Sequence, residues 1–373
     1  MIYLDYAATT PVDKEVQETY FSLVSSLFGN PDSIHSVGVD AARLVDTARD
    51  AILNLLKLKK YDVIFTSGAS ESNNLAIKGV ALKYMSKGKH IITTNVEHAS
   101  VMNTCKQLEE YFGFDVTYLP VNKDGVITCE QVANALRDDT ILVSVMAVNN
   151  EIGTINPINE ISKLLRDKHI YFHVDFVQAC GKLPVDYTVA DLGTLSAHKI
   201  HGLKGSGLLY KGTNIDLVPV IAGGSQENGL RGGTNNAPTN IVFAKTLRKA
   251  LESQSKSYEQ IKKLNDKMRI AFSSNPKIVI NNPAEASPYI LNFRTKLGSE
   301  VMMNALQAAG FLVSARSTCA SNYNDASHVL LAIGLTEKEA NSSIRVSLQN
   351  DVTEKEIDSF INAVNEIVAK YCK

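Results

Sequence analysis

The sequence Ser-Ala-His-Lys-Ile-His-Gly occupies residues 196–202, near the middle of the 373-residue chain. A second stretch, His-Val-Asp-Phe-Val-Gln, lies upstream at residues 173–178. Each stretch contains or follows a run of apolar and β-branched residues, which predicts a buried strand. The pattern therefore puts Lys199 and Asp175 at or just beyond the ends of two strands.

The region around these strands predicts a mainly parallel sheet. Strands are expected at 62–66, 90–94, 115–119, 141–148, 170–175, 192–196 and 207–210, and helices at 70–87, 100–112, 129–136 and 158–168. Such alternation is typical of βα units. Because open α/β sheets bind ligands beyond the carboxyl ends of their strands, we expect polar residues that follow these strands to meet at one edge.

The pattern changes after a long polar helix expected from residue 239 to about 273. Separate strands at 278–280, 290–293 and 343–348, and an amphipathic helix at 354–371, indicate a second, α+β unit. We expect a large domain over residues 12–255 and a smaller domain formed by residues 1–11 and 256–373.

Composition excludes several classes of partner. The formal net charge is −1, with 45% hydrophobic and 21% charged residues, so bulk charge favours neither nucleic acid nor a membrane surface. No apolar run approaches 18 residues, and the chain does not open on a basic segment followed by an apolar one. We expect a cytoplasmic protein with no direct nucleic-acid or membrane partner.

The cysteines and histidines argue against disulfides and metals. The five cysteines are an odd number and form no Cys-x-x-Cys pair. His169 and His173 are four residues apart, but the residues between them are strand-like and no third ligand is evident. We expect no metal site.

A lysine and an upstream aspartate at strand ends are the parts that a pyridoxal phosphate enzyme needs. The lysine forms a Schiff base with the cofactor aldehyde, and the aspartate keeps the pyridinium nitrogen protonated, so that the ring acts as an electron sink. We therefore expect Lys199 and Asp175 to hold this cofactor.

Two groups of donors suit the cofactor phosphate. Residues 67–74, Ser-Gly-Ala-Ser-Glu-Ser-Asn-Asn, follow a strand and open a helix, so the first helical amides and the Ser70 hydroxyl can hold a phosphate. An ordinary capping box from Ser70 to Asn73 is the alternative. Ser196 and His198 provide the second group beside Lys199.

Three further residues suit the cofactor ring. His98 follows the strand at 90–94, where its imidazole can stack on the ring and shuttle protons; a hydrogen-bonded structural histidine is the alternative. Asn150 and Gln178 are neutral hydrogen bonders suited to the ring oxygen, and for Asn150 a turn at 149–153 is the alternative.

Several motifs together carry a family resemblance. Residues 4–11 read Leu-Asp-Tyr-Ala-Ala-Thr-Thr-Pro, residues 29–31 read Gly-Asn-Pro, and residues 149–153 read Asn-Asn-Glu-Ile-Gly. With the segments at 67–74, 173–178 and 196–205, they resemble the cysteine desulfurases of the NifS and IscS type. These belong to the class V aminotransferase group of fold-type I pyridoxal phosphate enzymes. The resemblance implies an α/β fold with a mixed seven-stranded sheet in the large domain, a smaller α+β C-terminal domain, and a homodimer.

The resemblance also implies roles for single residues. Lys199 carries the cofactor, Asp175 binds the pyridinium nitrogen, and His98 is the stacking acid and base. Asn150 and Gln178 contact the ring oxygen. The implied phosphate ligands are Ala69, Ser70, Ser196, His198 and, from the neighbouring subunit, Thr234 in the segment 223–234. The substrate L-cysteine contacts Asn30, Asn150 and Arg345, whose planar guanidinium matches a carboxylate.

Cys319, in Ser-Ala-Arg-Ser-Thr-Cys-Ala-Ser at 314–321, is the expected sulfur-bearing residue. A cysteine in a loop of small polar residues can attack the substrate sulfur and carry a persulfide. Its sulfur acceptor is expected to be a protein of iron–sulfur cluster assembly or tRNA thiolation. Cys105, Cys129 and Cys180 are expected to be buried packing residues.

Several positions depart from the family pattern, and two of them bear most on the site. Arg316 stands where relatives have glycine, and Phe176 stands where they have a small residue, so its ring is expected against the cofactor face opposite the histidine. Two alternatives follow. One is a selenocysteine lyase, or another β-elimination lyase of the same fold, and the other is a catalytically weakened scaffold that binds a sulfur-carrier protein.

Overall fold

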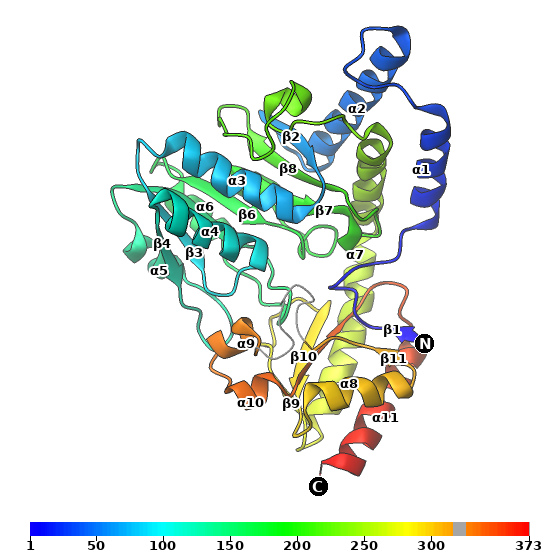
Figure 1. The fold of residues 1–373 in the computed structure, drawn as a ribbon. Coiled ribbons are helices and arrows are strands. Elements are labelled where there is room, and N and C mark those ends of the chain that lie inside the picture. The colour runs from blue at the N-terminus through cyan, green and yellow to red at the C-terminus, as the bar shows by residue number, and fades with distance from the viewer. Residues whose placement is uncertain (316–325, 373) are drawn as a thin grey trace.

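A single long helix, α7 (Ala237–Ser273), runs through both parts of the molecule (Figure 1). The computed structural model describes residues 1–315 and 326–372. Arg316 and Cys319 lie outside the described residues. No helix in the described ranges combines the length and the apolar character that crossing a membrane requires.

The larger part is built on one mixed sheet. Its strands are β2 (Tyr61–Thr66), β3 (His90–Thr94), β4 (Asp115–Leu119), β5 (Thr140–Met146), β6 (Tyr171–Asp175), β7 (Leu192–Ser196) and β8 (Gly207–Gly212). They lie in the order β2-β8-β7-β6-β5-β3-β4. β8 is antiparallel to both neighbours, and the remaining pairs are parallel. The predicted mixed seven-stranded sheet is confirmed.

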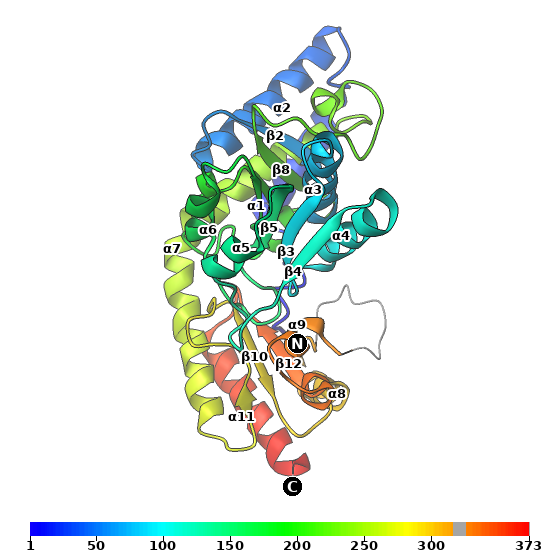
Figure 2. The ribbon, with the colours of Figure 1, turned by 90° about the vertical axis from the view of Figure 1, so that its left-hand side faces the viewer.

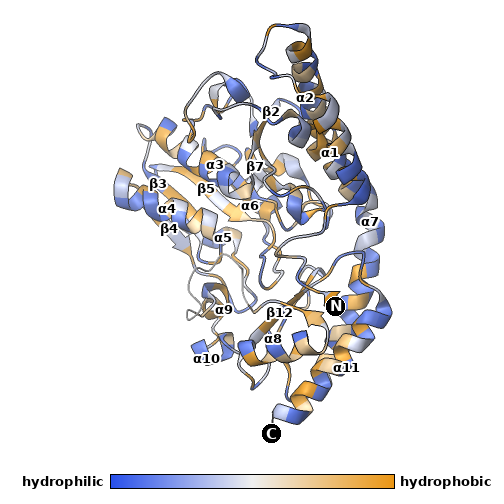
Figure 3. Cartoon of the chain, turned by 45° about the vertical axis from the view of Figure 1, so that its right-hand side comes forward, coloured by the Kyte–Doolittle hydropathy of each residue, from blue (hydrophilic) through white to orange (hydrophobic). Residues whose placement is uncertain are grey.

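Helices cover both faces of this sheet (Figures 1 and 2). They are α1 (Lys14–Ser26), α2 (Ser36–Leu55), α3 (Ala69–Tyr84), α4 (Ala99–Phe112), α5 (Cys129–Ala135) and α6 (Ile158–Leu165), with a short 3-10 turn, η1, at Tyr187–Val189. Neighbouring strand residues alternate between the two apolar cores. Ile64 packs with α3 and α4, whereas Val63 and Phe65 pack with α2 and α7. Both faces are therefore buried, which accounts for the hydrophobic strands in Figure 3.

The smaller part contains two short sheets. β1 (Ile2–Tyr3) pairs parallel with β11 (Phe311–Leu312), and β10 (Ile290–Arg294) pairs antiparallel with β9 (Val279–Ile280) and β12 (Ser343–Ser347). Its helices are α8 (Ser299–Ala308), α9 (His328–Ala332), α10 (Glu337–Ala340) and α11 (Glu354–Tyr371). The N-terminal segment therefore belongs to the C-terminal part.

The apolar cores separate partway along α7. Phe243 and Leu247 pack into the core of the large sheet, whereas Ile261, Met268 and Phe272 pack with the small sheets and α11. This separation supports the expected division, and we propose residues 12–255 as one domain and residues 1–11 with 256–373 as the other. α1 and α2 were not predicted from the sequence.

Candidate active site

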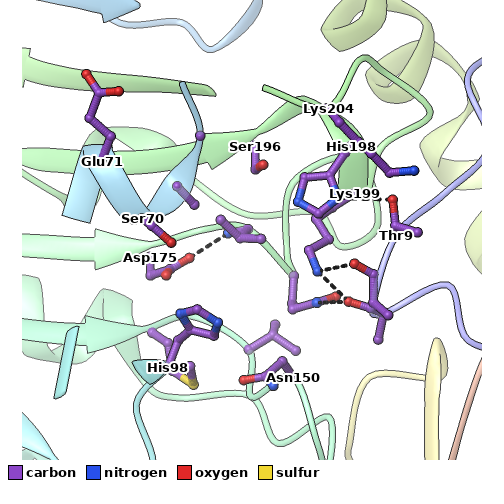
Figure 4. A pocket seen from close by; sticks show the side chains of 18 of the residues that line it. Thr9, Ser70, Glu71, His98, Asn150, Asp175, Ser196, His198, Lys199 and Lys204 are labelled. Atoms are coloured by element: carbon purple, nitrogen blue, oxygen red, sulfur yellow. Dashed lines mark hydrogen bonds between the residues drawn. The ribbon is translucent and has the colours of Figure 1, made fainter. Parts of the chain in front are cut away.

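A cavity of about 500 Å³ lies at the carboxyl ends of β2, β5, β6 and β7 (Figure 4). Of the residues predicted to form the site, those that line it are Ala69, Ser70, His98, Asn150, Asp175, Gln178, Ser196, His198, Lys199 and Arg345. Thr9 and Lys204 also line it and were not predicted. The N-terminal segment, the large sheet and β12 thus meet around one space.

Lys199 reaches this cavity from a short 3-10 turn, η2 (Ala197–Lys199), that follows β7 directly. The turn is closed by the amide of Ile200, which donates to the carbonyl of Ala197 at 3.0 Å. The Lys199 Nζ donates to the carbonyl oxygens of Ala7 at 2.6 Å and Ala8 at 2.7 Å (Figure 4). The amine therefore lies between the sheet edge and the N-terminal segment.

Asp175 ends β6 and is held by two donors. Its Oδ1 accepts from the Val177 amide at 2.9 Å, and its Oδ2 accepts from Asn73 Nδ2 at 2.9 Å. The residue is only 6% exposed. A buried carboxylate with both oxygens hydrogen-bonded is fixed in orientation and suits a cationic ring nitrogen.

His98 is the N-cap of α4, and its Nδ1 accepts from the Ser100 amide at 3.2 Å. Ser100 Oγ lies 2.8 Å from the same nitrogen. Because a backbone amide can only donate, Nδ1 is an acceptor and the neutral ring carries its proton on Nε2. Asn73 Nδ2 donates to both Ser100 Oγ and Asp175, so a bridge of two side chains joins the histidine to the aspartate.

The first turn of α3 supplies free backbone donors. The helix begins at Ala69 after the N-cap Gly68, which makes no side-chain cap bond, so the capping-box alternative from Ser70 to Asn73 is wrong. Gly68 has a φ of 153°, a conformation that L side chains rarely adopt. A Cβ on Gly207 would lie 2.5 Å from the Gly68 Cα, so the two backbones approach closely. The uncapped amides favour an anion at this end of the cavity.

Ser196 and His198 flank the same end. The Ser196 Oγ is buried and has no hydrogen-bond partner among the described residues. His198 Nδ1 lies 3.1 Å from Thr9 Oγ1. Burial and the neighbouring charges of Lys199 and Lys204 lower the pKa of His198 to about 4. An unpaired buried hydroxyl is costly unless a ligand completes its hydrogen bond.

Arg345, on β12, brings a buried guanidinium to the cavity. It is 2% exposed, with Nη2 donating to Asp5 Oδ1 at 2.8 Å and Nη1 to the Asn150 carbonyl at 3.0 Å. Its Nε is buried and has no partner in the described part of the chain. A carboxylate ligand would satisfy it.

Phe176 does not line the cavity, so the expectation that its ring faces the cofactor is wrong. The ring is fully buried, 5.0 Å from Tyr187 and 6.2 Å from Tyr210 between ring centroids. Successive side chains of an extended segment point to opposite faces, so Phe176 points away from the side that Asp175 faces. Val177 lines the cavity instead.

The remaining predicted residues lie elsewhere. Asn30, in the segment between α1 and α2, and Thr234, beyond β8, are exposed and do not line the cavity of their own chain. Cys105 and Cys180 are buried, and burial raises the pKa of each thiol to about 12, whereas Cys129 is half-buried. Cys319 lies outside the described residues.

His173 is buried with both ring nitrogens occupied. Its Nδ1 lies 2.8 Å from Ser144 Oγ, and its Nε2 lies 3.0 Å from Thr194 Oγ1. No group of three or more metal-ligating side chains occurs within residues 1–315 and 326–372.

Comparisons with known proteins identify the family of this chain. The family described as aminotransferase class-V matches residues 2–360. A cysteine desulfurase IscS from Dictyoglomus turgidum is 42% identical over 376 residues, which cover 99% of this chain and 95% of that protein. The solved structure of a NifS-like protein has a TM-score of 0.91 at 34% identity, over 99% of both chains. A structure of SspA in complex with cysteine has a TM-score of 0.82 at 37% identity, over 93% of this chain and 99% of that one.

The chain therefore belongs to the class-V aminotransferase family, whose members use pyridoxal phosphate. Within this family it groups with the cysteine desulfurases of the IscS and NifS type. The residues present fit the cofactor. The uncapped end of α3 and the orphaned Ser196 hydroxyl suit its phosphate, and the fixed carboxylate of Asp175 suits its ring nitrogen.

Proposed function

We propose that the chain is a pyridoxal phosphate-dependent cysteine desulfurase that converts L-cysteine to L-alanine and transfers the sulfur to Cys319. The observation that carries this proposal is one cavity lined by the amine of Lys199, the carboxylate of Asp175 and the guanidinium of Arg345. An amine, a pyridinium partner and a carboxylate ligand are the groups that an amino acid and this cofactor require.

When bound through Lys199, pyridoxal phosphate supplies an electron sink that lets bonds at the amino acid's Cα and Cβ break. The residues that would hold it are Lys199, Asp175, Asn150 and Gln178 around the ring, and Ala69, Ser70, Ser196 and His198 at the phosphate. Asp175 suits its role because both oxygens are already fixed and the carboxylate is buried.

Arg345 binds and orients the substrate. Its Nε–H is buried and unpaired in the described residues, so a carboxylate arriving there gains a charge-assisted hydrogen bond without breaking an existing one. Asp5 and the Asn150 carbonyl hold the guanidinium in place. His98 serves as acid and base at Nε2, because its Nδ1 is occupied by Ser100.

Cys319 accepts the sulfur. Its thiolate attacks the sulfur of L-cysteine, forming an S–S bond while the Cβ–S bond breaks, and the substrate carbon skeleton takes up a proton to become L-alanine. The other described cysteines are poor candidates, since Cys105 and Cys180 are buried with raised pKa values. The persulfide then passes to an acceptor protein for iron–sulfur cluster assembly or tRNA thiolation.

The active unit is proposed to be a homodimer. Thr234 is exposed and absent from its own cavity, so a partner subunit is the place where it can bind a phosphate. Large apolar side chains are exposed nearby on α1 and the following segment: Phe21 is 57%, Phe28 83% and Ile34 99% exposed. The hydrogen bond from Gln226 Nε2 to Asp32 Oδ2, at 2.8 Å, joins that segment to the loop carrying Thr234. A second copy of the chain that packs here would cover these apolar side chains and the loop that carries Thr234.

The test is a comparison of two cysteine variants. Cys319→Ser should keep the visible absorbance of the bound cofactor but lose release of alanine and sulfide from L-cysteine. Cys129→Ser, at a half-buried cysteine, should retain both. Continued release by Cys319→Ser would contradict the persulfide role and favour a β-elimination or selenocysteine lyase. A wild-type protein that binds no cofactor would favour the scaffold alternative.

A further inference from the structure

A buried lysine lies behind the cavity wall. Lys182 follows the end of β6 by seven residues, is 3% exposed and does not line the cavity. Its Nζ donates to Oε1 of Gln178 at 2.7 Å. Lysine is almost never fully buried without a charged partner, because burying an ammonium beside a neutral group is costly. Because this burial is costly, we infer that Lys182 has a function in the neighbouring site.

Lys182 and Ala7 together fix the carboxamide of Gln178. The Gln178 Nε2 donates to the Ala7 carbonyl at 3.1 Å, and a carbonyl oxygen can only accept. The amide oxygen must therefore face the other way, where Lys182 donates to it. A flipped carboxamide would oppose oxygen to oxygen at Ala7 and lose the bond from Lys182. Gln178 lines the cavity, so it offers its NH₂ group there.

The same carbonyl links this pair to the cofactor lysine. Ala7 O accepts from both Gln178 Nε2 and Lys199 Nζ. Three ionisable groups act on Lys182, namely Lys199, Arg345 and the Cys180 thiol. Burial and the charge of Lys199 lower the pKa of Lys182 to about 7. Lys182 and Lys199 are therefore electrostatically coupled as well as joined through hydrogen bonds.

We propose that Lys182 is a positioning residue that holds the Gln178 NH₂ group toward the ring oxygen of the bound cofactor and repels a further proton near Lys199. This inference rests on the proposed function in one respect, namely that the protein binds pyridoxal phosphate. Both effects favour loss of the proton from the Lys199 nitrogen. A donor at the ring oxygen favours its deprotonated form, and Lys182, while it is protonated, disfavours positive charge on the Lys199 nitrogen. Without Lys182, that nitrogen keeps its proton to higher pH.

The readout is the visible absorbance of the cofactor-loaded protein as a function of pH. Lys182→Met should raise the titration midpoint by about half to one pH unit, the equivalent of one lost hydrogen bond. Gln178→Leu should raise it similarly, and the double variant should shift it no further than the larger single shift. Lys182→Gln keeps a donor without the charge and should fall between wild type and Lys182→Met.

Lys211→Met is the matched control. Lys211 is also buried, at 5% exposure, but it pairs with Asp62 at 2.9 Å and lies opposite Leu192, at the end of β7 away from the cavity, so its variant should leave the midpoint unchanged. An unmoved midpoint in both Lys182 variants, or fully additive shifts in the double variant, would overturn the inference. A Lys182-dependent midpoint in a protein that releases no alanine from L-cysteine would instead refute the proposed function alone.

Discussion

Glu227 anchors the loop that carries Thr234. It lies in the turn η3 (Gln226–Gly229), and its side chain is 3% exposed. Its Oε2 accepts from Arg49 Nη1 at 3.0 Å and from the Phe65 amide at 2.8 Å, and its Oε1 accepts from Arg49 Nη2 at 3.2 Å and from Asn235 Nδ2 at 2.6 Å. One carboxylate thus ties the loop to α2 and β2.

Glu227→Gln keeps the volume but removes the buried counter-ion of the Arg49 guanidinium, which is 19% exposed, and leaves it the exposed carboxylate of Asp46 at 3.8 Å. Removing one partner of a buried ion pair costs about 3–5 kcal/mol, and the partial exposure of Arg49 puts this case near 3. For 373 residues unfolding as a unit, that corresponds to a Tm lower by about 4 °C. Differential scanning calorimetry of the cofactor-free protein measures this difference in Tm.

The control is the exposed pair of Arg137 and Asp139, each 43% exposed. Asp139→Asn should lower the Tm by about 1 °C at most. The double variant Arg49→Met with Glu227→Gln should regain at least half of the lost Tm, because neither buried charge remains unpaired. A Glu227→Gln protein that melts within 1 °C of wild type, or no recovery in the double variant, would refute the reasoning.

Three further predictions follow from the cavity and the core. Ser196→Ala should weaken cofactor binding about tenfold or more without lowering the Tm of the cofactor-free protein, because the hydroxyl has no partner among the described residues; equal cofactor affinity in a fluorescence titration would contradict this. Arg345→Lys should lower kcat/KM for L-cysteine about 10- to 100-fold while leaving the cofactor spectrum unchanged, and unchanged steady-state kinetics would refute it. Burial lowers the pKa of His173 to about 3, whereas in the unfolded chain this histidine has its ordinary pKa of about 6.5. Between these two pH values only the unfolded chain binds a proton at His173, so the free energy of unfolding should fall as the pH drops from about 6.5 toward 3. The Tm of His173→Asn should fall less between pH 7 and 5, and an equal fall would count against the assignment.

The sheet could be predicted because each strand is marked by its own short run of residues. Strands buried on both faces read as short hydrophobic runs, and the residues after them, such as Asp175 and Lys199, are carried to one edge whatever the helices do. α1 was missed for the complementary reason. Val16 is buried and Tyr20 and Leu23 are half-buried, but Phe21 and Val24 are exposed in the single chain, and these exposed apolar side chains weaken the core-facing pattern.

Side-chain partners across elements could not be predicted from spacing. Asn73 and Ser100 come from two helices and meet only because α3 and α4 pack on one face of the sheet. Lys182 reads as an ordinary polar residue until its burial is known. Phe176 is a different case. Strand alternation beside Asp175 predicts that the Phe176 ring faces the core, as the structure shows, whereas the family resemblance predicts a place against the cofactor.

The most direct test of the central claim is to find which lysine carries the cofactor. Lys199 and Lys204 both line the cavity, and Lys182 lies behind Gln178, so three amines compete. The loaded protein is treated with borohydride, digested and analysed by peptide mass spectrometry. The expected result is a phosphopyridoxyl group on Lys199 alone. The same group on Lys182 or Lys204, or on no lysine in a protein that still releases alanine from L-cysteine, would contradict the account.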